Sequence, residues 1–168
     1  HYVDGPTLNL KYSSFVGLHP VPVVHGMTVG EYARMINGEG WLKDGVKCDL
    51  KIISIQNYTH STRYQLPINP SPNLPNSKAI NLYPSLCFFE GTNMSMGRGT
   101  EYQFQVIGSP YLGGDLYNYE FTPQSKVGAK YPVHEGVICK GLNLQDHPHL
   151  DYIELKWLID AYQNTSDK

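Results

Sequence analysis

The sequence predicts an α+β fold: a small mixed sheet, a few helices and long loops rich in proline and glycine. Apolar residues recur at helical spacing near 28–38 and 151–162, and short alternating segments typical of strands lie between these regions. Of the 168 residues, 40% are hydrophobic and 17% are charged. This length and composition suffice for a core, so we expect residues 1–168 to form a single domain.

The first part of the chain holds one clear helix signal. Residues 1–22 are interrupted by proline and glycine and should be extended and irregular. Thr28 and Glu31 have the spacing of a capping box and precede an apolar stripe that Gly38 should end. Residues 49–55 (DLKIISI) mix polar and apolar side chains in a pattern that predicts a strand.

Proline dominates the next segment. Four prolines lie within 66–75 (LPINPSPNLP), which excludes a helix or a central strand and leaves a stiff loop. A stiff loop loses little entropy when a ligand binds, so Ser71 and Asn73 are candidate contact residues. A rigid linker that binds nothing explains the same spacing equally well.

The rest of the chain alternates short predicted elements. A short helix should run from Ser77 to Tyr83, ahead of Pro84. Strands are expected at 86–89, 102–107 and 117–121, followed by a strand pair or bent strand at 133–144 and a final helix at 151–162.

The densest polar chemistry lies at 90–100 (EGTNMSMGRGT), directly after the apolar run 86–89. The segment combines a carboxylate, three glycines, an amide, three hydroxyls and a guanidinium. Glycines let a backbone approach a ligand closely, and loops on a rigid scaffold often carry function. The alternative is a polar turn in which Glu90 and Arg98 form a structural ion pair.

Composition excludes several classes of function. A net charge of −2 argues against a nucleic-acid binder. The three cysteines lack the number and spacing of a disulfide framework or a zinc site, and the pair His147 and His149 is more typical of a turn than of a metal site. We therefore expect no metal and no cofactor.

No signal peptide and no apolar run near the ~20 residues of a membrane span are present. A chain opening at His1 suggests a processed chain or a piece of a longer protein.

Glycoside hydrolysis would require two carboxyl groups, one of which donates a proton. Glu90 is the strongest candidate, because its segment follows an apolar run and is rich in hydrogen-bonding groups. Glu101, Glu39 and Asp115 are the candidates for its partner, and the sequence singles out none of them. The second carboxylate is one of these three, or it is missing from this chain altogether.

Five motifs occur in order along the chain: VDGP at 3–6, SFVGLHPVP at 14–22, HGMTVGE at 25–31, SPNLP at 71–75 and EGTNMSMGRGT at 90–100. Together they closely resemble the C-terminal part of the exo-β-N-acetylmuramidase family. The resemblance covers most of the chain and is densest between Gly17 and Thr100.

This resemblance implies a glycoside hydrolase that releases terminal, non-reducing N-acetylmuramic acid from peptidoglycan fragments. It also implies a bacterial protein of the cell envelope (periplasm) or a secreted one. Family members are similar to two-subdomain proteins, with a Rossmann-like N-terminal half and an auxiliary C-terminal half around a shared cleft. Only the auxiliary half is expected here, so the Rossmann-like half would be a partner and this chain alone would be inactive.

We expect Glu90 to be the catalytic residue and the substrate contacts to come from His25, Asn73, Thr92, Asn93 and Arg98. A guanidinium can bind the lactyl carboxylate of muramic acid in bidentate fashion, which suits Arg98. The two asparagine amides can both donate and accept hydrogen bonds, as the N-acetyl group and hydroxyls require. The alternative is a non-catalytic glycan-binding or scaffold module.

Overall fold

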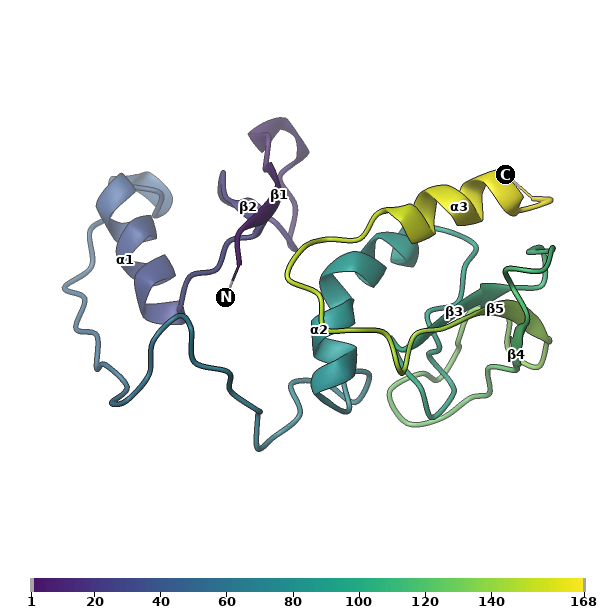
Figure 1. Ribbon diagram of the computed structural model, residues 1–168. Helices are drawn as coiled ribbons and strands as arrows, with labels where there is room; N and C mark the ends of the chain where they lie inside the picture. The colour runs from purple at the N-terminus through teal and green to yellow at the C-terminus, as the bar shows by residue number, and fades with distance from the viewer. Residues whose placement is uncertain (1, 168) are drawn as a thin grey trace. The chain divides into compact units, whose positions relative to one another are not determined.

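The computed structural model describes residues 2–167, which form an α+β fold as predicted (Figure 1). The described chain has three α-helices, a two-stranded sheet and a three-stranded sheet, both antiparallel. We expected a single domain, whereas the chain separates into two compact units, His1–Tyr64 and Gln65–Lys168. Each unit is described by itself below.

The first unit consists of a small sheet, one helix and extended segments. Strand β1 (Asp4–Thr7) pairs with β2 (Pro22–Val24) in antiparallel orientation, with an irregularity in the register between its two ends. Residues 1–22, expected to be irregular, therefore contribute a strand and a short 3-10 helix, η1 (Leu10–Tyr12). Helix α1 (Val29–Glu39) follows.

Helix α1 begins with the predicted capping box. The Thr28 hydroxyl accepts a hydrogen bond from the Glu31 N–H (3.3 Å), and the Glu31 carboxylate accepts one from the Thr28 N–H (2.7 Å). The Thr28 N–H and the His60 side chain lower the pKa of Glu31 below its ordinary value, in that order of importance. The helix ends at Gly40, which adopts the left-handed conformation (φ 72°), and not at Gly38 as predicted.

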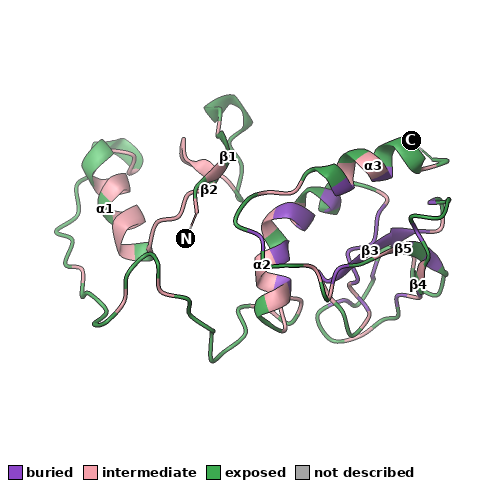
Figure 2. Ribbon diagram, viewed as in Figure 1, coloured by how far each residue is buried: buried purple, intermediate pink, exposed green. Residues whose placement is uncertain are grey.

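No described residue of the first unit is fully buried, as Figure 2 shows. The strand predicted at 49–55 is absent: these residues form no strand and no backbone–backbone hydrogen bond with the described part of the chain. The physical reason is that a strand requires a neighbouring strand, and none lies beside this segment among the described residues.

The second unit starts with the proline-rich loop and helix α2 (Ser77–Leu86), which continues past Pro84 into the 3-10 helix η3 (Cys87–Gly91). The strand predicted at 86–89 is therefore wrong. Leu82, Leu86 and Phe89 follow one another at helical spacing and are all fully buried, so the apolar run faces the core as helix. Periodicity alone does not distinguish a short buried strand from a buried helical turn.

The sheet of the second unit has the order β3-β5-β4. Its strands are β3 (Val106–Ser109), β4 (Tyr119–Phe121) and β5 (Cys139–Asn143), each shorter than the segments predicted at 102–107, 117–121 and 133–144. Phe104 and His134 explain two of the shortened ends, because both have positive φ angles (52° and 61°) that interrupt an extended strand.

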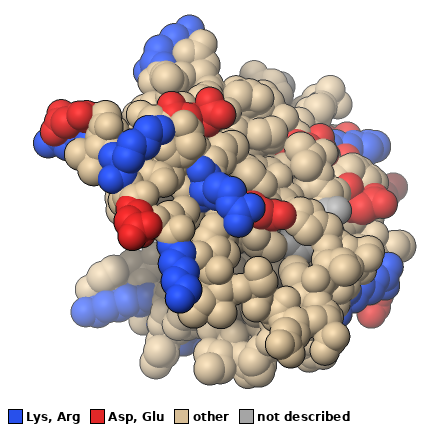
Figure 3. Space-filling view, turned by 90° about the vertical axis from the view of Figure 1, so that its left-hand side faces the viewer, with Lys and Arg blue, Asp and Glu red and all other residues tan. Residues whose placement is uncertain are grey.

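The core of the second unit lies among α2, the sheet and helix α3 (Lys156–Asn164). Helix α3 begins five residues later than the predicted 151–162, and it contributes Trp157 and Ala161 to the core. Among the described residues, no helix combines the length and apolar character that crossing a membrane requires. The face drawn in Figure 3 carries basic and acidic side chains close together, with wide uncharged areas between them.

Candidate functional site

The structure brings Glu90 and Arg98 together in the second unit. Glu90 lies in η3, and Arg98 lies in the glycine-rich loop that follows. The Arg98 Nη2 and the Glu90 Oε1 are 3.5 Å apart, and the two side chains are 40% and 37% exposed. A carboxylate and a guanidinium are thus presented side by side at the surface, where both can reach a ligand.

The backbone that carries Arg98 is tightly packed on both sides. Gly97 and Gly99 have positive φ angles (74° and 82°). A Cβ at Gly97 would lie 2.5 Å from the Tyr102 carbonyl oxygen, and one at Gly99 would lie 2.5 Å from that of Gln124. Only glycine fits this path, which explains the Gly-Arg-Gly sequence and fixes the origin of the Arg98 side chain.

The Arg98 side chain lies over the buried ring of Phe104. Its Cζ is 5.5 Å from the centre of the Phe104 ring, and the Tyr83 ring meets Phe104 edge-on at 5.0 Å. Phe104 is 1% exposed and has a positive φ of 52°, which is rare for a bulky residue. Its N–H donates to the Met96 carbonyl oxygen at 2.8 Å, which holds the backbone in this strained conformation.

The side of the helical segment near Glu90 carries two further polar groups. Tyr83, Cys87 and Glu90 follow one another at intervals of four and three residues, so they share one helical face. Burial, with the Glu90 charge adding to it, raises the pKa of Tyr83 and that of Cys87. Both groups therefore remain protonated near neutral pH, and the Tyr83 phenol is available as a hydrogen-bond donor.

Thr92 and Asn93, which closely follow Glu90 in the sequence, face a groove that Glu90 and Arg98 do not line. They line a largely apolar groove of about 670 Å³ between η3 and α3, together with residues such as Phe89, Ile159 and Tyr162. The Asn93 amide donates to the Asp167 carboxylate (3.0 Å), and the Thr92 hydroxyl donates to the Phe89 carbonyl oxygen (2.8 Å). Glu90 and Arg98 are not among the residues that line this groove.

Asn73 holds two loops together. Its side-chain amide donates to the Gly128 carbonyl oxygen at 2.9 Å. A Cβ at Gly128 would lie 2.7 Å from Pro72, so the two loops are in close contact. The described partners of Asn73 thus belong to these loops, and not to the pair of Glu90 and Arg98.

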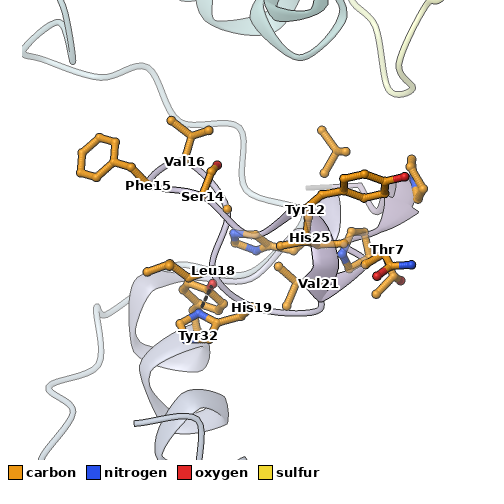
Figure 4. A pocket seen from close by; sticks show the side chains of 16 residues that line it. Thr7, Tyr12, Ser14, Phe15, Val16, Leu18, His19, Val21, His25 and Tyr32 are labelled. Atoms are coloured by element: carbon orange, nitrogen blue, oxygen red, sulfur yellow. Dashed lines mark hydrogen bonds between the residues drawn. The ribbon is translucent and has the colours of Figure 1, made fainter. Parts of the chain in front are cut away.

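His25 belongs to the first unit, where it lines an open groove of about 830 Å³ (Figure 4). Its ring stacks on Tyr32 (5.0 Å between centres, 14° between planes), and its Nδ1 accepts a hydrogen bond from the Met27 N–H at 3.1 Å. His19 meets the Tyr32 hydroxyl at 2.8 Å. The groove walls are mostly apolar or aromatic, as Tyr12 illustrates.

The other carboxylates considered as partners of Glu90 lie in exposed positions. The Glu101 side chain is 81% exposed and forms an ion pair with Lys126. Asp115 and Glu39 are also exposed. Within residues 2–167, no group of three or more histidine, cysteine, aspartate or glutamate side chains could hold a metal ion.

Sequence reasoning did not find Tyr83 or Phe104. The strand predicted at 86–89 hid the helical spacing that relates Tyr83 to Glu90. Phe104 was assigned to a strand, where its ring would have alternated with polar neighbours. The available signal was the helical spacing of the apolar residues from 79 to 89, which continues through Pro84.

Comparison with models of known protein families shows which family the chain belongs to. Residues 1–78 match the model for the N-terminal region of the exo-β-N-acetylmuramidase NamZ, and residues 81–167 match the model for its C-terminal region. The chain belongs to the NamZ family. The resemblance seen in the five motifs is confirmed, and residues 1–78, which it grouped with the C-terminal part, match the N-terminal model.

Individual NamZ relatives agree with this assignment. The peptidoglycan β-N-acetylmuramidase NamZ of Bacillus subtilis (strain 168) is 32% identical, over 86% of this chain and 37% of its own length. A crystal structure of a DUF1343 family protein from Bacteroides fragilis NCTC 9343 superposes with a TM-score of 0.95 at 54% identity, covering 99% of this chain and 48% of its own.

A second DUF1343 family protein from the same organism has a TM-score of 0.77 at 21% identity, over 94% of this chain and 44% of its own, which shows a shared fold. The chain therefore spans less than half of the length of each of these three relatives.

Proposed function

We propose that this chain works as part of a longer exo-β-N-acetylmuramidase, which releases terminal, non-reducing N-acetylmuramic acid from peptidoglycan fragments. The observation that carries the proposal is the pair of Glu90 and Arg98, whose side chains are 3.5 Å apart in a chain of the NamZ family. Because peptidoglycan lies outside the cytoplasmic membrane, we place the protein in the cell envelope or among secreted proteins.

Arg98 is proposed to bind the lactyl carboxylate of muramic acid. Its ion pair with Glu90 is long (3.5 Å) and both side chains are partly exposed, so the pair contributes at most about 1 kcal/mol. A substrate carboxylate can therefore replace Glu90 as the partner of Arg98 at little cost. Phe104 supports the guanidinium from below, which leaves its outer edge for the ligand.

Glu90 is proposed to transfer a proton at the glycosidic bond. When the lactyl carboxylate occupies Arg98, the Glu90 carboxyl group remains beside the bound sugar and can act as general acid or base. The Tyr83 phenol, protonated at neutral pH, can donate a hydrogen bond in the same place. The second carboxylate is proposed to come from the part of the NamZ family fold outside this chain.

The remaining predicted contacts are proposed to bind other parts of the glycan. The amides of Asn73 and Asn93 and the Thr92 hydroxyl can form hydrogen bonds with N-acetyl groups and sugar hydroxyls. The His25 ring, stacked on Tyr32, offers a flat surface in the groove of the first unit.

One observation favours the alternative, a glycan-binding module without catalytic activity. The Glu101 side chain, the carboxylate nearest to Glu90 in the sequence, is 81% exposed and paired with Lys126. The described ion pair of Glu101 is thus with Lys126 and not with Glu90's neighbour Arg98, although two carboxyl groups are usually required for glycoside hydrolysis.

We expect the isolated 168-residue chain to hydrolyse a chromogenic N-acetylmuramic acid glycoside on the order of 100-fold more slowly than the full-length protein, because proximity of both catalytic groups is lost. Its second unit should nevertheless fold, since it has its own core. Specific activities of the two purified proteins, measured side by side, test this. Equal activities would place the whole active site within these residues, and an inactive full-length protein would support the binding module.

A further inference from the structure

The described residues of the first unit form no buried core, as expected for a fold that is completed by another part of the protein. None of its described residues is fully buried, whereas all core residues belong to the second unit (Figure 2). A small unit without a core buries too little apolar surface to offset the entropy of ordering its chain. The fold is nonetheless shared with a 54%-identical crystal structure that superposes on 99% of the chain with a TM-score of 0.95.

We propose that residues 49–56 form a strand of a β-sheet whose other strands belong to the part of the NamZ fold outside this chain, and that α1 covers one face of that sheet. The proposal concerns the interaction surface of the first unit. It depends on family membership and not on the catalytic role of Glu90.

The sequence of the segment fits a strand covered on both faces. Side chains of a strand alternate between its two faces, so Leu50 and Ile52 point to one side and Ile53 and Ile55 to the other. Each side therefore carries two apolar residues beside one polar residue, Ser54 on the first side and Lys51 on the second. Three of the four apolar residues are isoleucine, which is β-branched. This pattern is typical of strands inside a sheet with layers on both faces.

Helix α1 contacts one of these two faces at Ile52, while Leu50 on the same face is 40% exposed. A Cβ at Gly30 would lie 2.8 Å from Cγ2 of Ile52, so the helix approaches the segment as closely as glycine allows. Asn37 of the same helix holds the start of the segment: its side chain accepts from the Cys48 N–H (2.8 Å) and donates to the Cys48 carbonyl oxygen (3.0 Å). The helix and the extended segment therefore pack as two layers.

The face formed by Ile53 and Ile55 is exposed, and the backbone of the segment is unpaired among the described residues. Ile53 is 86% exposed and Ile55 is 74% exposed. Residues 49–56 make no backbone–backbone hydrogen bond with any described residue, and Figure 1 draws them as an extended trace after α1. Unpaired backbone beside exposed isoleucines is a template for pairing with other strands.

The part of the family fold outside this chain is the best partner for the exposed face and unpaired backbone of residues 49–56. The chain accounts for only 48% of the length of the relative with which it shares its conformation, so more than half of such a protein is available to supply strands and a covering layer. A second copy of this segment would pair with one edge of the strand and leave the exposed face of Ile53 and Ile55 uncovered. A sheet with its own helical layer covers both.

Amide hydrogen exchange tests the proposal. In the isolated chain, the amides of residues 50–56 should exchange nearly as fast as in an unfolded peptide. In the full-length protein they should exchange on the order of 100-fold more slowly, because they are paired within a sheet. In the full-length protein, Ile53→Asp should abolish this protection, while Val127→Asp, at a similarly exposed position (91%) of the second unit, should not.

Three results would overturn the proposal. Fast exchange of residues 50–56 in the full-length protein would show that no sheet forms there. Protection in the isolated chain that rises with protein concentration would assign the surface to a second copy. Protection in the isolated chain at all concentrations would assign it to the second unit. The wild-type comparison decides among these even if Ile53→Asp fails to fold, and none of the readouts depends on enzymatic activity.

Discussion

Replacing Glu90 by glutamine in the full-length protein is expected to lower the turnover of an N-acetylmuramic acid glycoside on the order of 100-fold or more. Glutamine retains the size of the side chain but neither donates nor accepts a proton as a carboxyl group does. Glu90 is partly exposed, and its ion pair with Arg98 is weak, so the fold should be unaffected. Steady-state kinetics and a thermal unfolding curve measure the two effects.

Glu101→Gln is the matched control for this substitution. Glu101 is eleven positions further along the chain and more exposed, and its described partner is Lys126. Its replacement should leave turnover unchanged. Near-normal release of muramic acid by Glu90→Gln would reduce Glu90 to a structural ion pair, which is the alternative that the sequence left open.

Gly141→Ala is expected to have the largest effect on stability. Gly141 lies in β5, the central strand of the sheet, opposite Gly108 of β3 and Tyr119 of β4. A Cβ at this position would lie 1.7 Å from the Ile107 carbonyl oxygen and 2.6 Å from the Gly108 Cα, so backbone and not a mobile side chain would have to move. We expect a loss of about 3 kcal/mol or more in the free energy of unfolding.

Chemical denaturation of the second unit measures this loss, and Gly113→Ala is its control. A Cβ at Gly113 would have no neighbour within 4 Å, so this substitution should change stability little. Equal stabilities of the two variants would mean that the sheet is not packed as described.

The elements that the sequence predicts well are those fixed by local chemistry. The capping box of Thr28 and Glu31 is formed within four residues, so its sequence signature is sufficient. The strands predicted at 86–89 and 49–55 are both wrong, for opposite reasons. The first is an apolar run whose helical course is decided by core packing with Leu82, and the second has a strand pattern but no strand beside it.

The candidate site is likewise predictable only where local sequence determines it, and not where packing between distant segments does. Glu90 and Arg98 belong to one short segment, so their meeting was foreseeable as an ion pair. Phe104 supports Arg98 through a positive φ angle that no sequence rule assigns to phenylalanine. Asn73 was expected near the same site, but its amide bonds to Gly128, a contact set by the folding of two loops against each other.

The most direct test of the proposed site compares two sugars that the protein cannot hydrolyse further. N-acetylmuramic acid differs from N-acetylglucosamine by its lactyl carboxylate, so a site built around Arg98 should bind muramic acid more tightly. In the full-length protein, Arg98→Gln should weaken muramic acid binding about 10- to 100-fold, because hydrogen bonds to a charged group are lost, and should leave N-acetylglucosamine binding unchanged.

Isothermal titration calorimetry of the wild-type and Arg98→Gln proteins with both sugars measures the difference. We expect the variant to lose its preference for muramic acid. An unchanged preference would show that the lactyl carboxylate binds elsewhere and would contradict the proposed role of Arg98.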